Sequence, residues 1–446
     1  MQKVSVVGLG KLGLCLASCL AHRGFEVIGV DIQENVVDAV NSGSSPIVEP
    51  ELAELIADIS GTRLKATTSH KEAIDQSDIT FVLVATPSNS DGSFSNRYIE
   101  AALKSLAIAF RESKKAYHLF VISSTVMPGS TEASFIPILE KYSGRKLNQD
   151  FALCYDPDFV ALGDVVKGFL YPDLVVIGET TPEAGARVEA VHRQLCENEP
   201  AISHMSIISA EIAKVCLNVY ITLKVSFANS IANLCERIPG ADVDDITQAI
   251  GADRRISPFY FQGGLSFGGT CFPRDSQAYI SLASKYGVQA EQVHATVRVN
   301  EHQDKRLSEV VLREAATLEN EAVGILGMAF KPNTPVITES PTIKLVQELL
   351  RNDMRIVVYD SLAIENTKAV FGDAIEYVCS PEECLAESGL CVVALRVPEF
   401  KQAVESYMSS KPLIVVDCWR MIDATRLHQN IKYVALGRAL RTNPGT

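Results

Sequence analysis

Paired cysteines, long apolar runs and an excess of basic residues are all missing from this sequence. The 11 cysteines include no C-x-x-C pair, stand at no cysteine–histidine spacing suited to zinc, and are odd in number. We therefore expect no metal site, and in a reducing compartment most thiols should be small buried apolar side chains. No segment approaches the roughly 20 uninterrupted apolar residues that a membrane span requires.

The start of the chain and its charge balance exclude further classes of protein. After Met1-Gln2-Lys3 the chain enters a short apolar run with a glycine motif, which is not the pattern of a signal peptide. We therefore expect a cytoplasmic protein without a membrane partner. With 41 Lys and Arg against 54 Asp and Glu, the net charge of -13 argues against non-specific nucleic-acid binding, which needs a basic face. An anionic substrate must be met by a few placed cations.

The length and the pattern of apolar residues predict an α/β protein of several domains. A chain of 446 residues with 47% apolar residues and no low-complexity tract is expected to form two or three globular domains. Residues 3–7 form a predicted strand, 14–22 an apolar helix and 25–31 a second strand, which together make a βαβ unit. Further predicted strands of this first sheet cover residues 79–85, 119–123, 151–155 and 174–178.

A long apolar segment without proline, residues 206–237, predicts a helix that bridges domains or forms a subunit interface. We predict two Rossmann-like doubly wound parallel-sheet domains joined by this long central helix. The first domain covers residues 1–200, a central helical segment covers 201–314 and a C-terminal α/β domain covers 315–446. Predicted strands of the second sheet cover 322–326, 355–359, 390–395 and 413–417, a helix covers 293–313, and 441–446 form a disordered tail.

The first motif is Gly8-Leu9-Gly10-Lys11-Leu12-Gly13, between the first strand and the first helix. Its glycines permit a tight turn and let backbone N–H groups approach a pyrophosphate. Asp31 ends the next strand, where a carboxylate accepts hydrogen bonds from ribose hydroxyls and repels a 2′-phosphate. The strand, helix and acid together favour NAD as the cofactor over glycines that serve only close helix packing.

The second motif is Phe267-Gly268-Gly269-Thr270-Cys271, followed by Arg274 and Asp275. Neighbouring cations or a helix N-terminus would make such a thiol a nucleophile. From residue type alone, however, Cys271 is better interpreted as a small buried apolar side chain.

The order of motifs along the chain changes that balance, because it resembles the UDP-glucose/GDP-mannose dehydrogenase family from the first strand to about residue 420. The resemblance is carried by the two motifs above together with Ser124-Thr125-Val126, Asp156-Pro157-Asp158-Phe159, a helix over 211–218, and Phe330-Lys331-Pro332-Asn333-Thr334. Cys271-Phe272-Pro273-Arg274-Asp275 is similar to the Cys-Phe-Pro-Lys-Asp of UDP-glucose 6-dehydrogenases, whereas GDP-mannose relatives more often have Leu after the cysteine.

This resemblance implies a four-electron, NAD-dependent oxidation of the C6 hydroxyl of a nucleotide sugar, foremost UDP-glucose to UDP-glucuronate, in a homodimer or higher homo-oligomer. It also implies that 1–200 is an NAD-binding domain, 201–314 a dimerisation and catalytic segment, and 315–446 a nucleotide-sugar-binding domain. Cys271 would attack an enzyme-bound C6 aldehyde, and the thiohemiacetal would become a thioester that water hydrolyses. The implied catalytic residues are Thr125, Asp158, Lys214, Asn218, Cys271 and Asp275. The implied cofactor-binding residues are Gly8, Gly10, Lys11, Leu12, Gly13, Asp31, Thr86, Pro87, Ser124 and Thr125. The implied substrate-binding residues are Phe159, Lys214, Asn218, Arg255, Tyr260, Phe261, Gly263, Phe267, Gly268 and Lys331, with Arg255 reaching the sugar of the neighbouring subunit.

The helix positions Lys214 and Asn218 are four apart and therefore share one face. There an ammonium and an amide could stabilise the same developing oxyanion. The alternative is a polar stripe on a solvated helix. Asp158 stands where the family usually has Glu, so the carboxylate is kept but is one methylene shorter.

Two further departures affect the substrate prediction. Leu162 and Thr338 stand where the family commonly has Glu and Arg near the cofactor. The same chemistry on UDP-N-acetylhexosamine, GDP-mannose or a rarer nucleotide sugar therefore stays open. Less favoured alternatives are a two-electron β-hydroxyacid dehydrogenase, which needs neither the cysteine nor a second α/β domain, and a catalytically silent nucleotide-sugar binder.

Overall fold

The computed structural model describes residues 3–318 and 321–439, and the chain divides into two compact units, Met1–Leu217 and Asn218–Thr446. The predicted tail at 441–446 lies outside the described residues. Because the division falls inside the predicted central segment, 201–314, the three-part division of the chain stays a prediction. The two units are described separately.

The first unit is built on an eight-stranded sheet of order β3-β2-β1-β4-β5-β6-β7-β8. Its first six strands have the order of a doubly wound dinucleotide-binding fold. The strands are β1 (Lys3–Val7), β2 (Glu26–Val30), β3 (Leu64–Thr67), β4 (Ile79–Val82), β5 (His118–Ile122), β6 (Phe151–Tyr155), β7 (Leu174–Glu179) and β8 (Ala201–Met205). The predicted parallel α/β fold is confirmed.

One strand pair corrects the prediction of a wholly parallel first sheet, because β7 runs antiparallel to β6. A strand that is buried on both faces reads as a continuous apolar run whichever way its neighbour runs. The sequence of β7 therefore does not encode its direction. β3 and β8 were not predicted, because neither is a continuous apolar run: β3 alternates buried and exposed residues, and β8 lies partly exposed at the sheet edge.

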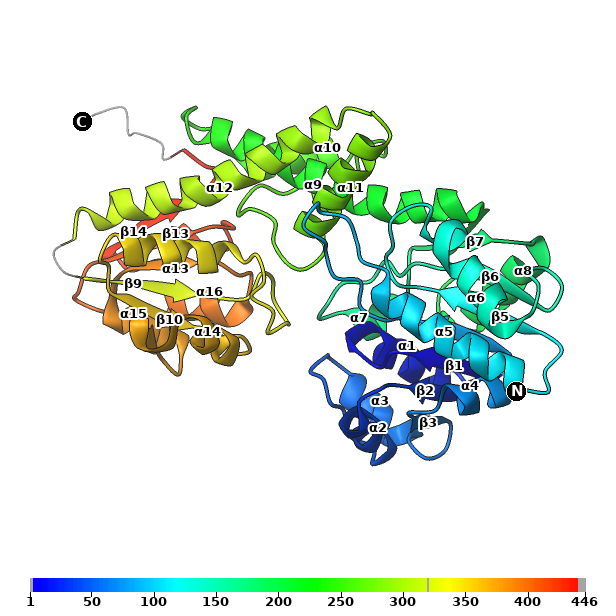
Figure 1. Ribbon diagram of the computed structural model, residues 1–446. Helices are drawn as coiled ribbons and strands as arrows, with labels where there is room; N and C mark the ends of the chain where they lie inside the picture. The colour runs from blue at the N-terminus through cyan, green and yellow to red at the C-terminus, as the bar shows by residue number, and fades with distance from the viewer. Residues whose placement is uncertain (1–2, 319–320, 440–446) are drawn as a thin grey trace. The chain divides into compact units, whose positions relative to one another are not determined.

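Helices cover both faces of this sheet (Figure 1). One apolar core joins the sheet to α1, α3, α7 and α8, and a second core joins the opposite face to α4, α5, α6 and the start of α9. The helices are α1 (Lys11–His22), α2 (Glu34–Asn41), α3 (Leu52–Ile59), α4 (His70–Gln76), α5 (Arg97–Glu112), η1 (Thr131–Phe135), α6 (Ile136–Ser143), α7 (Val165–Leu170), α8 (Pro182–Leu195) and α9 (Ile207–Cys235).

α9 is the long helix predicted over 206–237, and it contains the boundary at Leu217. Within the described ranges it is the one helix that is long and apolar enough, by length and composition alone, to cross a membrane. The sequence predicted no membrane span there, because the charged residues Glu211, Lys214 and Lys224 interrupt its apolar run. Glu211 and Lys214 are buried in the protein.

The second unit is built on a six-stranded parallel sheet of order β11-β10-β9-β12-β13-β14. It repeats the doubly wound order, with a switch point between β9 and β12. The strands are β9 (Ala322–Leu326), β10 (Ile356–Tyr359), β11 (Glu376–Tyr377), β12 (Ser388–Val393), β13 (Leu413–Asp417) and β14 (Ile431–Ala435). Of these, β11 and β14 were not predicted, because both are short of buried residues.

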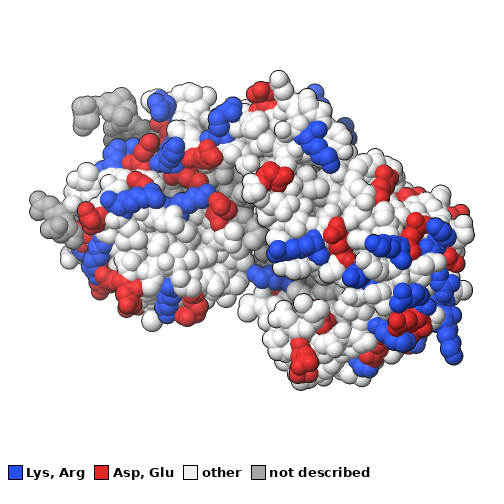
Figure 2. Space-filling model, in the orientation of Figure 1, with Lys and Arg blue, Asp and Glu red and all other residues white. Residues whose placement is uncertain are grey.

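One large apolar core joins this sheet to its helices. The helices of the second unit beyond α9 are α10 (Val243–Gly251), α11 (Phe272–Lys285), α12 (Glu291–Ala315), α13 (Pro341–Arg351), α14 (Ile364–Phe371), η2 (Gly372–Ala374), α15 (Pro381–Glu387), α16 (Pro398–Glu405) and η3 (Ala424–Arg426). α12 extends the helix predicted over 293–313 by two residues at each end. Acidic and basic side chains are interspersed over the face shown in Figure 2.

Candidate functional site

The glycine loop after β1 requires its first and last glycines for steric reasons. Gly8 has φ +94°, and a Cβ there would lie 2.4 Å from the carbonyl oxygen of Leu83. A Cβ at Gly13 would lie 1.8 Å from the carbonyl oxygen of Gly8, whereas one at Gly10 would meet nothing within 4 Å. The open space at Gly10, just before the first residue of α1, fits a diphosphate bound at a helix N-terminus.

Asp31 lies beside this loop. Its Oδ2 accepts a hydrogen bond from the Leu9 N–H at 2.8 Å, and its Oδ1 accepts one from the Gln33 N–H at 3.0 Å. The carboxylate is thereby held at the end of β2, next to the glycine turn. This arrangement fits the ribose hydroxyls of NAD.

The other predicted cofactor residues of this unit follow β4 and β5. The Ser124 hydroxyl accepts from the Val84 N–H at 2.9 Å and donates to the Val84 carbonyl at 2.8 Å, which ties the two segments together. Thr86 is buried, and Pro87 and Thr125 are half-buried. Because β1, β4 and β5 are parallel neighbours, their carboxyl ends place these residues along one edge of the sheet.

A carboxyl group with a raised pKa follows β6. The Lys214 ammonium donates to the backbone carbonyl of Asp158 and stands 4.8 Å from the centre of the Phe159 ring. Burial and then repulsion from Asp156 raise the pKa of Asp158 to about 8, although Lys214 and His192 lower it. Such a group can exchange a proton near neutral pH.

Glu211 fixes the start of α9 to the segment that follows β5. Its buried carboxylate accepts hydrogen bonds from the Gly129 N–H at 2.6 Å, the Thr131 N–H at 3.1 Å and the Thr131 hydroxyl at 2.7 Å. Lys214 lies nearly one turn further along the helix. The Glu211 contacts therefore position the helical turn that carries Lys214.

In the second unit, Cys271 is exposed and stands directly before α11. This corrects the interpretation from residue type alone, which placed Cys271 in the apolar core. Its Sγ lies 3.6 Å from the Thr270 hydroxyl oxygen. The N-terminus of α11 favours negative charge, as a nucleophilic thiolate requires.

The glycines before Cys271 pack against the loop that carries Lys331. A Cβ at Gly268 would lie 2.2 Å from the Glu339 carbonyl oxygen, and one at Gly269 would lie 2.5 Å from the Phe330 ring. The Gly269 N–H donates to the Thr338 carbonyl at 3.0 Å. The two loops therefore form one packed substructure, in which the backbone of Thr338 is part of the support.

Asn218 and Asp275 form a buried polar pair. Asp275 is 1% exposed, and its Oδ2 accepts from Asn218 Nδ2 at 2.6 Å while its Oδ1 accepts from Arg274 Nε at 3.2 Å. Lys214 and Asn218 are themselves buried. The alternative of a solvated polar stripe on this helix is therefore wrong.

Three buried amide side chains hold the predicted substrate loop, and none of them was predicted. Asn229 donates to the Leu265 carbonyl at 3.1 Å and accepts from the Gly264 N–H at 2.7 Å. Asn300 donates to the Phe267 carbonyl at 3.0 Å and accepts from its N–H at 2.8 Å, and Gln303 donates to the Gly264 carbonyl at 2.5 Å. Asn229 interrupts the apolar run of α9 and was the available signal there, whereas Asn300 and Gln303 lie among charged residues of α12 and gave none.

The same loop is closely packed at Gly263, where a Cβ would lie 2.7 Å from Ala232, and Phe261 and Phe267 are buried. Tyr260 is partly exposed and adopts φ +58°, a strained conformation for a bulky residue. Lys224 donates to the carbonyl groups of Ser257 at 3.0 Å and Phe259 at 2.6 Å. This part of the loop is therefore held by its backbone, and the partly exposed Tyr260 ring packs edge-on against Phe272.

Arg255 points into solvent. Its side chain is 86% exposed and pairs with Asp253 at 2.6 Å. The exposure leaves the guanidinium accessible to a ligand or to another subunit.

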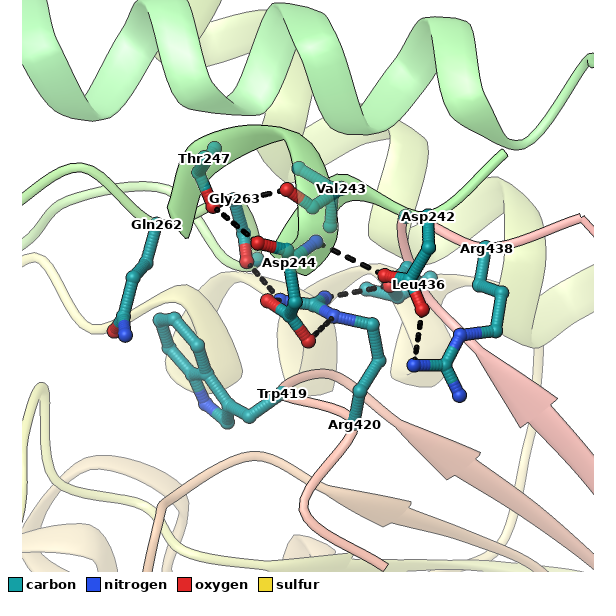
Figure 3. A network of polar contacts seen from close by, with 12 residues as sticks. Asp242, Val243, Asp244, Thr247, Gln262, Gly263, Trp419, Arg420, Leu436 and Arg438 are labelled. Carbon is teal, nitrogen blue, oxygen red and sulfur yellow. Dashed lines mark hydrogen bonds and ion pairs between the residues drawn. The ribbon is translucent and has the colours of Figure 1, made fainter. Parts of the chain in front are cut away.

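Arg420 connects the end of β13 to α10 and to the substrate loop (Figure 3). Its buried guanidinium bonds both carboxylate oxygens of Asp244 at 2.8 Å and donates to the carbonyls of Leu436 at 2.6 Å and Gly263 at 2.7 Å. Its backbone has φ +57°. No sequence pattern indicates this residue, because its partner Asp244 lies 176 residues away.

The two departures from the family pattern have different surroundings. Leu162 is partly buried and packs against the apolar core that contains α1 and α7. Thr338 contributes its carbonyl to the Gly269 contact described above. An apolar side chain at position 162 therefore has a packing role of its own.

Comparison with known proteins matches all three parts of one family in order. Residues 2–196 match the NAD binding domain of the UDP-glucose/GDP-mannose dehydrogenase family, residues 208–302 its central domain and residues 324–424 its UDP binding domain. UDP-glucose 6-dehydrogenase AglM of Haloferax volcanii is 35% identical over 94% of this chain and 97% of that protein. GDP-mannose 6-dehydrogenase of Pseudomonas aeruginosa is 34% identical over 80% of this chain and 81% of that protein. A solved UDP-glucose dehydrogenase from Pyrobaculum islandicum is 32% identical, covers 98% of both chains and has a TM-score of 0.89.

Proposed function

Because the chain belongs to the UDP-glucose/GDP-mannose dehydrogenase family, we propose that it oxidises the C6 hydroxyl of UDP-glucose to the carboxylate of UDP-glucuronate. The chain is an NAD-dependent nucleotide-sugar dehydrogenase; the identity of the sugar and the covalent route are the proposal. The observation that carries the route is the exposed thiol of Cys271 at the N-terminus of α11. A buried thiol could not reach a sugar.

The choice of UDP-glucose has three supports. Residues 324–424 match a UDP binding domain, and the Haloferax volcanii relative, similar over almost its whole length, is a UDP-glucose 6-dehydrogenase. Phe272, directly after the cysteine, is the residue typical of such enzymes. We place the nucleotide sugar against Lys331 and the loop of Tyr260, Phe261, Gly263, Phe267 and Gly268.

Bound NAD supplies the oxidising power, since it accepts one hydride in each of the two oxidations. The Cys271 thiol adds to the C6 aldehyde, forming an Sγ–C6 bond while its proton passes to the carbonyl oxygen. The second oxidation leaves a thioester. Water then adds at C6, the Sγ–C6 bond breaks, and the sulfur regains a proton. The balance is one alcohol, two NAD⁺ and one water giving one carboxylate, two NADH and three H⁺.

The other residues act on the charges of this sequence. The Lys214 ammonium stabilises the developing oxyanion, and Asn218 adds a donor for the same oxygen. Asp158, with its pKa of about 8, takes and returns protons through a water molecule because its side chain is short. Asp275 orients Asn218 through their hydrogen bond, and Thr125 bonds an ordered water or reacting oxygen.

We further propose a homodimer. Tyr220, Phe227 and Leu234 of α9 are exposed and lie seven residues apart, or about two turns. They therefore form an apolar stripe along one face of the helix, which suits a second copy of the chain. In such a dimer the exposed Arg255 would reach the neighbouring subunit's sugar. A cytoplasmic location stays part of the same proposal.

The proposal is tested by incubating the protein with NAD and, separately, UDP-glucose, GDP-mannose and UDP-N-acetylhexosamines, while NADH absorbance and the sugar product are followed. We expect the highest kcat/KM with UDP-glucose and two NADH per UDP-glucuronate. If two NADH form per sugar only with another nucleotide sugar, the assignment of UDP-glucose as substrate is wrong. One NADH per sugar would overturn the four-electron reaction.

The covalent route is tested with Cys271→Ala, using Cys379→Ala as the matched control because Cys379 is also an exposed thiol. Cys271→Ala should reduce carboxylate formation at least about a thousandfold, the lower range for loss of a nucleophile, with NAD binding retained. Cys379→Ala should retain full activity. Carboxylate formation above that level by Cys271→Ala would exclude the thioester.

A further inference from the structure

A buried ion pair lies at the carboxyl end of β6. His192 of α8 donates from Nε2 to Oδ2 of Asp156 at 2.8 Å, and the two residues are 8% and 4% exposed. The Asp156 N–H also donates to the Ile122 carbonyl at 2.9 Å. The pair is thus fixed between α8 and the sheet.

The pair stands next to the proposed acid–base residue. Asp158 follows Asp156 by two positions, and its Oδ2 is buried without a hydrogen-bond partner among the residues that the structure describes. The charged groups that face it are Asp156 from the end of β6, His192 from α8 and Lys214 from α9. Since Oδ2 is buried, these charges act on it through a medium of low polarity.

We propose that His192 and Asp156 are positioning residues that set the proton affinity of Asp158. The Asp156 carboxylate disfavours a second negative charge beside it, while the His192 imidazolium favours one and holds Asp156 in place. Together they would keep Asp158 able to exchange a proton at neutral pH. This inference rests on the proposed function, in which Asp158 moves protons.

The charge state of His192 agrees with this arrangement. Burial lowers its pKa, but the charge and the hydrogen bond of Asp156 outweigh burial and raise the pKa to about 10. The raised pKa favours the imidazolium form of His192 in the neutral range. The pair then presents one positive and one negative charge to Asp158. Loss of the positive charge alone should raise the pKa of Asp158, and loss of the negative charge should lower it.

The test is the pH dependence of kcat and kcat/KM in His192→Gln and Asp156→Asn proteins. The acid limb is the part of the pH profile in which activity falls as Asp158 becomes protonated. Glutamine at position 192 keeps a donor for Asp156 but carries no charge. Ionised Asp158 then loses an attraction, so the acid limb should move to higher pH. Asparagine removes the repulsion and also the charge that keeps His192 protonated. Because repulsion from Asp156 outweighs attraction by His192, the limb should still move to lower pH. We expect each shift to be about half a pH unit or more, since a nearby charge moves a carboxyl pKa on this scale.

Two further variants separate the possible failures. His204→Gln is the matched control, because His204, like His192, is a histidine bonded to carboxylate. Its partners are Glu179 at 2.7 Å and Glu189 at 2.8 Å, and it is not among the groups that act on Asp158. Its acid limb should stay in place. Asp158→Asn should abolish the limb; if the limb and the activity persist, the proposed function of Asp158 fails.

If Asp158→Asn abolishes the limb but His192→Gln and Asp156→Asn leave it unmoved, or move it in the same direction, the positioning role alone is overturned. Should a single variant not fold, the double variant Asp156→Asn/His192→Gln removes both charges together and leaves no unpaired buried ion. Its limb should lie below that of the unmodified protein, because repulsion from Asp156 outweighs attraction by His192. A limb at or above the original position would contradict the proposal.

Discussion

Asn218 Nδ2 donates a 2.6 Å hydrogen bond to Oδ2 of Asp275, which joins α9 to the helix that begins after the cysteine. Asp275→Ala would leave the Asn218 amide and the Arg274 guanidinium without this acceptor. We expect the free energy of unfolding to fall by about 1–3 kcal/mol, the cost of an unsatisfied buried polar group. Urea unfolding measures it, with the exposed Glu301→Ala on α12 as the control. A double-mutant cycle with Asn218→Ala should give a coupling of about 0.5–3 kcal/mol, and strict additivity would contradict the pairing.

Asp31 is predicted to select NAD over NADP. In Asp31→Asn the repulsion of a 2′-phosphate is lost while one acceptor for the Leu9 N–H remains, so the ratio of kcat/KM for NAD to that for NADP should fall at least about tenfold, or about 1.4 kcal/mol. Steady-state kinetics with each cofactor measures it. Asp38→Asn, which changes an exposed carboxylate on α2, should leave the ratio unchanged. An unaltered ratio in Asp31→Asn would show that Asp31 does not bind the ribose.

Arg420 should be required for the stability of the second unit. Arg420→Ala would leave Asp244 without its ion-pair partner and the carbonyl of Gly263 without a donor, at a cost of about 3–5 kcal/mol. Trp419, the single tryptophan, stands beside Arg420 and reports unfolding by its fluorescence. Arg298→Ala, at an exposed arginine of α12, should change stability by less than about 0.5 kcal/mol. Equal unfolding midpoints for the two variants would show that the Arg420 network contributes little to stability.

The apolar stripe on α9 is predicted to form the subunit interface. Phe227→Glu should shift the protein to a monomer in sedimentation, because a charge would be buried in the interface. Ile32→Glu, at an exposed apolar residue after β2, should leave the assembly unchanged.

Arg255 is predicted to act on the sugar bound by the neighbouring subunit. Inactive Arg255→Ala and Cys271→Ala proteins should regain activity when mixed, since one site of the heterodimer would receive both intact residues. Exchange of subunits without recovered activity would place the action of Arg255 within one subunit.

Local patterns in the sequence were sufficient for the parts of the fold whose cause is local. Strands β1, β6, β9 and β13 begin and end where predicted, because apolar residues dominate each of these short segments. The glycine loop and Asp31 were also predictable, since a tight turn between strand and helix restricts which residues can stand there. The Cys271 loop was recognisable by its glycines, although the exposure of its thiol was not.

Only the tertiary structure decided the remaining features, because they depend on residues far apart in the chain. The direction of β7 depends on its neighbour, and the bond between Arg420 and Asp244 joins residues 176 positions apart. The buried pair of His192 and Asp156 likewise requires α8 to pack on β6. A residue's type determines what charge or hydrogen bond it can offer, but the low-polarity interior decides how strongly that charge acts, and only folding creates that interior.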